Sequence, residues 1–307
     1  MPLDPGYDEM LRQLAALGGP SLAEVPVEVG REMFRAMQLE TPEIEVAAVT
    51  DITAGGVPAR VYRPHGDGPF PVVMMFHGGG WVIGDLATAD SQSREVCRGA
   101  GVVVVSVDYR LAPEHRFPAA AEDCYSATLW AAEHAGVHDG DPSSLAVAGD
   151  SAGGNLAAVV AQMARDRGGP QIAFQLLVYP VTDGVNFDTA SYRDNAEGYL
   201  LTAEAMHWFW DHYVPTRGDR RHPYASPLLA DDLSRLPSAL VMTAEYDPLR
   251  DEGEDYARAL AKAGVDARFV RYDGFIHGFF AHTRTINATR KAMSDACAAL
   301  RRAFNAN

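Results

Sequence analysis

The chain has 307 residues, of which 47% are hydrophobic and 22% charged, and its formal net charge at pH 7 is −15. This length and composition are typical of a globular protein with a large buried core, and they exclude a mainly disordered chain. The acidic balance, with only Lys262 and Lys291 as lysines, argues against nucleic acid or an anionic membrane surface as a partner.

The three cysteines, Cys97, Cys124 and Cys297, are far apart and form no CxxC pair. Such cysteines indicate reduced, buried thiols in a cytoplasmic protein rather than a disulfide framework or a zinc cluster. The first residues, "MPLDPGYDEM", lack a signal-peptide pattern, and no run reaches the roughly 18 apolar residues of a membrane span. We therefore expect a cytoplasmic protein without a membrane span or a metal site.

The first 45 residues contain two amphipathic helical runs. Met33 and Met37 in the second run share one helical face, which we interpret as ordinary packing. Residues 44–52 and 59–64 follow as strand-like runs, and the glycine-containing link between them favours a pair of antiparallel edge strands.

Buried strands and helices then alternate along the chain. The predicted strands cover residues 71–76, 102–109, 145–149, 174–179, 239–244 and 267–272, and the predicted helices cover 117–134, 152–166, 249–263 and 284–304. Alternation of this kind predicts an α/β fold with a mostly parallel sheet that is covered by helices on both faces.

One segment interrupts this alternation. Residues 185–225 are rich in aromatic side chains, and we predict that they form a helical cap together with residues 1–45. The catalytic domain would then consist of residues 46–184 and 226–307.

Ser151 lies in the stretch "GDSAGGN", between a predicted strand and a predicted helix. The glycines on either side allow a tight strand-to-helix turn, and the start of the helix favours a developing negative charge. This context is that of a G-x-S-x-G nucleophile elbow.

A second glycine-rich stretch, "HGGGW", directly follows the strand at 71–76. We predict that the backbone N–H groups of Gly78 and Gly79, together with that of Ala152, stabilise an oxyanion. His77 is interpreted as a residue that holds this loop.

The base is predicted to be His277, because it follows the last strand by a short loop. The carboxylate that orients it could come from Asp247, Asp251 or Asp273. Asp247 is favoured because it follows a strand at the same edge of the sheet. The chain order Ser151, Asp247, His277 is that of the α/β-hydrolases.

At this point the sequence resembles the hormone-sensitive-lipase family of esterases, in its bacterial branch with the GDSAG elbow. The resemblance is carried by "HGGGW" (77–81), "DYRLAPEHRFPAA" (108–120), "GDSAGGNLA" (149–157), "EYDPLRDEGEDYA" (245–257) and "GFIHGF" (274–279). It implies an α/β-hydrolase fold and hydrolysis of carboxylic esters with short to medium acyl chains, without a cofactor. Because family members often pair through the last strand and the final helix, it also suggests a homodimer.

The residues expected to line the acyl pocket are Trp81, Tyr179, Trp208 and Phe209. Two other readings remain open at this stage. One is a non-catalytic small-molecule binding protein on the same scaffold, which the presence of His277 disfavours. The other is an amidase, lactonase, deacetylase or peptidase, since these reactions pass through the same kind of oxyanion.

Overall fold

The computed structural model describes residues 1–37 and 44–305. Its centre is an eight-stranded sheet in the order β1-β2-β4-β3-β5-β6-β7-β8, in which β3 to β8 are parallel and the β1–β2 and β2–β4 pairs are antiparallel. The strands are β1 (Ala48–Ala54), β2 (Val57–Arg63), β3 (Phe70–Phe76), β4 (Val103–Val107), β5 (Gly140–Asp150), β6 (Phe174–Val178), β7 (Ser238–Tyr246) and β8 (Ala267–Ile276). Every predicted strand is present, but β2 is internal and only β1 lies at that edge.

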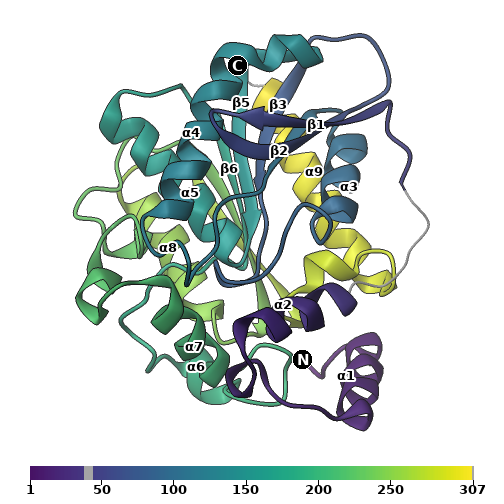
Figure 1. Cartoon of the computed structure of the whole chain (residues 1–307), viewed down its shortest axis with the longest axis vertical. Coiled ribbons are helices and arrows are strands. Elements are labelled where there is room, and N and C mark those ends of the chain that lie inside the picture. The colour runs from purple at the N-terminus through teal and green to yellow at the C-terminus, as the bar shows by residue number, and fades with distance from the viewer. Residues whose placement is uncertain (38–43, 306–307) are drawn as a thin grey trace.

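Helices cover both faces of the sheet, with α3 and α9 on one side and α4, α5 and α8 on the other (Figure 1). These helices are α3 (Asp90–Ala100), α4 (Ala119–His134), α5 (Ala152–Arg167), α8 (Arg250–Lys262) and α9 (Arg290–Asn305). The prediction of a mostly parallel sheet between two helical layers is confirmed. Helix α3 was not predicted.

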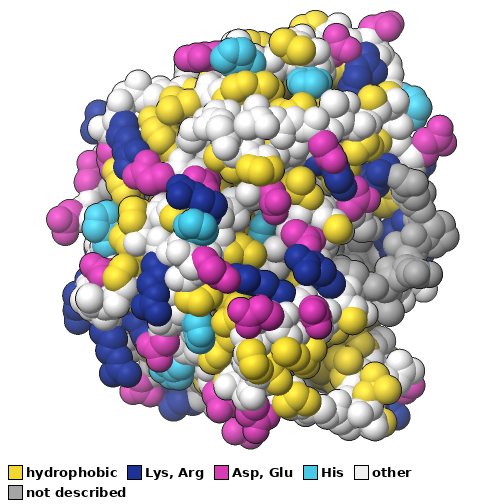
Figure 2. All heavy atoms as spheres, viewed as in Figure 1, with side chains coloured by type: hydrophobic (Ala, Val, Ile, Leu, Met, Phe, Trp, Pro, Cys, Tyr) yellow, Lys and Arg dark blue, Asp and Glu magenta, His cyan; other side chains and the backbone are white. Residues whose placement is uncertain are grey.

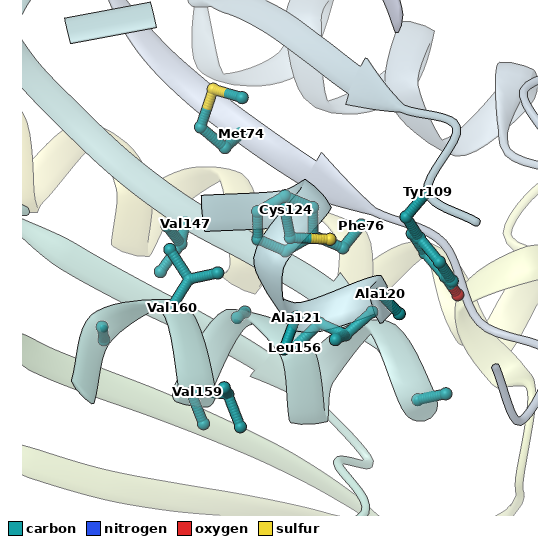
Figure 3. Close-up of a cluster of buried hydrophobic side chains, with 14 of the residues drawn as sticks. Met74, Phe76, Tyr109, Ala120, Ala121, Cys124, Val147, Leu156, Val159 and Val160 are labelled. Atoms are coloured by element: carbon teal, nitrogen blue, oxygen red, sulfur yellow. The ribbon is translucent and has the colours of Figure 1, made fainter. Parts of the chain in front are cut away.

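The alternation of side chains along β3 divides the core between these two layers. Met74 and Phe76 pack with α4 and α5, whereas Val73 and Met75 pack with α3 and α9. Figure 3 shows the first cluster, in which Cys124 of α4 and Leu156 of α5 meet the β3 side chains. Because adjacent residues of a strand point to opposite faces, a continuous apolar run is what a strand covered on both sides requires.

The remaining helices lie together at one end of the sheet (Figure 1). They are α1 (Pro5–Leu17), α2 (Val27–Ala36), α6 (Ala190–Asp194) and α7 (Ala203–Tyr213). The second predicted helical run is interrupted: a 3-10 turn at Leu22–Glu24 precedes α2, which begins directly after Pro26. Proline suits a helix start because it has no backbone N–H to leave unpaired there.

Arg31 links helix α2 to the segments that follow β3 and β4. Its guanidinium donates hydrogen bonds to the carbonyls of Val82 and Ala112 and forms a bidentate pair with Glu114. The division into a cap (1–45 and 185–225) and a catalytic domain (46–184 and 226–307) stays a prediction, and part of its first boundary region, 38–43, lies outside the described residues.

Acidic and basic side chains are interspersed over the face shown in Figure 2. No helix within residues 1–37 and 44–305 combines the length and the apolarity needed to cross a bilayer. Strand β8 forms one edge of the sheet. The homodimer through this strand and α9 stays a prediction.

Candidate active site

Ser151 sits on the sharp turn between β5 and α5, with φ of 56° and ψ of −119°. The turn requires glycine at two positions. A Cβ on Gly149 would lie 2.3 Å from the carbonyl carbon of Gly153, and a Cβ on Gly153 would lie 1.9 Å from the carbonyl oxygen of Phe76. Positive φ at a serine is strained. The close backbone packing around it holds the hydroxyl at the start of α5.

Three side chains from remote parts of the chain meet at this turn. The Oγ of Ser151 lies 3.0 Å from Nε2 of His277, and Nδ1 of His277 lies 2.8 Å from Oδ2 of Asp247. A buried carboxylate accepts the Nδ1 proton, so the lone pair of Nε2 faces the serine hydroxyl. All three residues are buried, and Asp247 is fully so.

The sheet explains why these residues meet. Ser151 follows β5, Asp247 follows β7 and His277 follows β8, and the carboxyl ends of parallel strands share one edge of a sheet. The second oxygen of Asp247 accepts the N–H of Leu249 at 2.8 Å, which fixes the carboxylate.

The two other aspartates that the sequence left open lie elsewhere. Asp251 accepts the N–H of Ser191 at 2.8 Å and pairs with Arg250. Asp273 is exposed. Of the three candidates, the structure therefore brings only Asp247 to His277.

The glycine loop after β3 differs from the prediction by one residue. The N–H of Gly78 donates to Oδ1 of Asp150 at 2.9 Å, so it is not available to a substrate oxygen, and its prediction as an oxyanion donor is wrong. Within the described residues, the N–H groups of Gly79, Gly80 and Ala152 have no hydrogen-bond partner. Gly79 and Ala152 stay predictions, and Gly80 was missed.

Gly79 and Gly80 are both in conformations that favour glycine, with φ of 110° and 57°. A Cβ on Gly79 would lie 2.1 Å from the carbonyl oxygen of Ile83, and a Cβ on Gly80 would lie 2.1 Å from the ring of Phe209 in α7. The loop is therefore confined between its own backbone and the aromatic side chain above it.

Two buried titratable groups hold this loop. His77 donates through Nδ1 to the carbonyl of Gly78 at 2.7 Å, and burial lowers its pKa to about 4, so it is neutral at pH 7. Burial raises the pKa of Asp150 to about 6, although the nearby His277 and the N–H of Gly78 lower it in part. His77 thus contacts the loop as expected, whereas Asp150 was missed.

A cavity of about 320 Å³ opens onto Ser151 and His277. Tyr179 and Phe209 line it, as expected for pocket residues. Met33 and Met37 of the N-terminal region also line it, so their shared face is part of this pocket and not only ordinary packing.

The two predicted pocket tryptophans do not line this cavity. Trp81 is fully buried and stacks on Tyr213, with 4.0 Å between ring centroids. Trp208 is half-buried and packs against His212 and the hydrophobic core. Successive residues of a helix point about 100° apart, and of these two neighbours only Phe209 lines the cavity. Both tryptophan predictions are corrected.

Within the part of the chain that the structure describes, no group of three or more His, Cys, Asp or Glu side chains is arranged to hold a metal ion. The polar groups that line the cavity beside Ser151 are hydrogen-bonding side chains and backbone amides. This arrangement suits acyl transfer through a serine nucleophile and a histidine base.

A family model described as the α/β hydrolase fold matches residues 73–281, and the chain belongs to this family. The resemblance to the hormone-sensitive-lipase-like esterases is confirmed. The carboxylic ester hydrolase LipN of Mycobacterium tuberculosis is 46% identical over 292 residues, which cover 90% of this chain and 77% of that protein.

Two solved structures extend the likeness to nearly the whole chain. A hyperthermophilic esterase from the archaeon Pyrobaculum calidifontis has a TM-score of 0.93 and 46% identity, covering 98% of this chain and 99% of that one. A thermostable esterase from Pseudomonas putida has a TM-score of 0.93 and 42% identity, covering 99% and 98%. The predicted enzyme class, a carboxylic ester hydrolase, is confirmed at the level of the class.

Proposed function

We propose that the chain hydrolyses carboxylic esters through an acyl-enzyme intermediate on Ser151. The observation that carries the proposal is the continuous line of contacts from Ser151 through His277 to the buried Asp247, on the floor of a cavity. The relatives named as carboxylic ester hydrolases and esterases support the same reaction class.

In the first half-reaction, the Oγ of Ser151 attacks the ester carbonyl carbon while Nε2 of His277 takes the hydroxyl proton. Asp247 keeps the imidazole in the required tautomer and stabilises its cation. The tetrahedral intermediate then collapses: the bond to the alcohol oxygen breaks, and His277 returns the proton to that oxygen. In the second half, His277 activates a water that cleaves the acyl-serine bond.

The negative oxygen of each intermediate would be held by the N–H groups of Gly79, Gly80 and Ala152. They are supported as donors by their lack of other partners in the described chain and by their position beside Ser151. Asp150 would fix the position of this loop by accepting a hydrogen bond from the N–H of Gly78. Loss of one such donor typically costs about 3 kcal/mol of transition-state stabilisation.

Short to medium acyl chains are the substrates that the cavity favours. Its volume of about 320 Å³ is at the lower limit of small-molecule sites, and Phe209 and Met206 of α7 close one side of it. We also propose a cytoplasmic location, supported by three cysteines that are all buried and unpaired.

The test is hydrolysis of p-nitrophenyl butyrate by variants of the proposed triad. Ser151→Ala and His277→Ala should each lower kcat by a factor on the order of 10⁶, because triad members act as a unit. Asp247→Asn should lower kcat by about 10⁴. Asp251→Asn is the matched control and should keep a rate close to that of the parent.

Folding of every variant is checked by circular dichroism. A rate near that of the parent in Ser151→Ala would refute the proposal and favour a binding protein. Parallel assays on the corresponding p-nitroanilide separate an esterase, which cleaves the ester far faster, from an amidase.

A further inference from the structure

The cavity above Ser151 has two chemically different sides. One side is apolar and comes from Leu22, Met33, Met206 and Phe209. The other side is polar and comes from the first turn of α3 and from the segment that follows His277. We call this second set the polar side, and it consists of Thr88, which precedes α3, and of Ser91, Gln92, His282, Arg284 and Thr285.

The two parts of the polar side are joined to each other. Thr283, next to His282, donates a hydrogen bond to Glu95 of α3 at 2.5 Å. His282 itself ends the 3-10 turn Phe279–His282, which begins two residues after His277. The polar side is therefore the wall of the cavity next to the proposed base.

Gln92 is the most informative residue of this wall. The residue is only 6% exposed, and within the described chain no hydrogen bond to its side-chain amide is present, but the amide atoms are not fully enclosed by protein. Fully buried amides in folded proteins are mostly paired within the protein, whereas an amide in the wall of a cavity can bind a partner from inside the cavity. Because Gln92 lines the cavity, a molecule in the cavity can supply the missing partner.

The start of α3 adds backbone donors at the same place. Its N-cap residue is Ala89, which has no side-chain oxygen to accept the N–H groups of the first turn. The N–H groups of Ser91 and Gln92 belong to that turn and lack intrahelical acceptors. A helix start of this kind, beside a side-chain amide in the wall of the cavity, favours an oxygen atom that accepts hydrogen bonds.

His282 can also donate a hydrogen bond to an oxygen atom in the cavity. Burial lowers the pKa of its imidazole, so the ring is neutral at pH 7 and presents one N–H donor. A neutral donor suits an uncharged acceptor oxygen as well as a carboxylate. The groups of this wall therefore have in common that they can donate hydrogen bonds to an oxygen atom.

We propose that the polar side binds an acceptor oxygen carried by the alcohol part of the ester, with Gln92 and His282 as specificity-determining residues. The inference rests on the proposed function, because the alcohol oxygen is the atom that receives the proton from His277. The alcohol part must then lie toward His277 and the segment after it, while the acyl part lies toward α7. The preferred substrates are acetates of alcohols with an ether, hydroxyl or second carbonyl oxygen.

The test compares n-alkyl acetates with acetates in which one CH₂ of the alcohol chain is replaced by an ether oxygen, at each position in turn. The parent and the variants Gln92→Met and His282→Phe are assayed, since both substitutions keep the shape and remove the polar atoms. Ser93→Ala is the matched control, because Ser93 is the next residue of α3 and does not line the cavity.

We measure kcat/KM for each ether ester relative to its alkyl partner. For at least one ether position, Gln92→Met and His282→Phe should each lower this ratio by about fivefold, the typical effect of one lost hydrogen bond. Ser93→Ala should leave the ratio unchanged. O-Acetyl hydroxy acids, in which the alcohol part of the acetate carries a free carboxylate, give the charged arm of the same comparison, and their methyl esters are the uncharged reference.

Unchanged ratios at every ether position and for the charged arm in both variants would overturn the inference. An effect seen only when the oxygen is moved into the acyl chain would overturn the assignment of this side to the alcohol. Failure of the proposed function would look different, because the alkyl acetates would then be hydrolysed without dependence on Ser151.

Discussion

Asp150 is the acidic residue beside the proposed nucleophile, and its replacement by asparagine tests the electrostatics of the site. Its carboxyl is buried, and Oδ1 accepts the N–H of Gly78 at 2.9 Å. Asparagine keeps an acceptor oxygen of the same size at that position. Asp150→Asn therefore removes the charge and retains the hydrogen bond that holds the glycine loop.

The size of the effect follows from the pKa of Asp150. Burial raises this pKa from 3.8 to about 6. Between these two values the unfolded chain loses the proton while the folded chain keeps it, so the free energy of unfolding falls as pH rises. The loss is complete above pH 6 and amounts to about 3 kcal/mol, at 1.36 kcal/mol for each unit of pKa difference. Asparagine does not incur this loss.

The assay is urea unfolding of the parent and of Asp150→Asn at several pH values. Asp150→Asn should be the more stable protein at pH 8, by up to about 3 kcal/mol, and its advantage should shrink by more than 1 kcal/mol at pH 5. Asp273→Asn, at an exposed position, is the control and should change stability by less than about 0.5 kcal/mol at both pH values. An advantage of Asp150→Asn that is absent, or that does not depend on pH, would refute this account of the buried carboxyl.

Two further predictions concern the loop and the cavity. Gly80→Ala should lower kcat for p-nitrophenyl butyrate by about 10² to 10³ with little loss of folded protein. The reason is that a methyl group at this position meets the Phe209 ring and displaces one proposed oxyanion donor. A kcat equal to that of the parent would exclude Gly80 from this role. Phe209→Ala should move the preference among p-nitrophenyl esters toward longer acyl chains, by about 0.8 kcal/mol for each added CH₂ that the enlarged cavity buries. Trp208→Ala, on the same helix but not in the lining of the cavity, should leave that chain-length profile unchanged, and equal shifts in the two variants would contradict the cavity described here.

Much of this site can be predicted from the sequence, because local chemistry and sheet topology act together. A serine between small residues at a strand–helix junction requires a turn such as that at Ser151. The carboxyl ends of parallel strands bring Asp247 and His277 to the same edge. These inferences need the order of elements but no detailed packing.

The predictions that were wrong or missing concern features that depend on the packing of side chains and not on the order of the elements. In a run of three glycines the sequence does not tell which N–H groups are free of a hydrogen-bond partner. In the structure, the carboxylate of Asp150 accepts a hydrogen bond from the N–H of Gly78. Trp81 and Trp208 are aromatic like Phe209, but their direction depends on the turn and the helix that carry them. Helix α3 buries polar side chains, including Gln92, so it lacks the apolar periodicity by which helices are recognised.

The central claim is that a covalent bond forms between the acyl group and Ser151. The most direct measurement is mass spectrometry of the protein quenched in acid during turnover of p-nitrophenyl butyrate. The account predicts one butyryl group per chain, located on the peptide that contains Ser151 and absent from Ser151→Ala. Acylation at another residue, or turnover by Ser151→Ala at the parent rate, would contradict it.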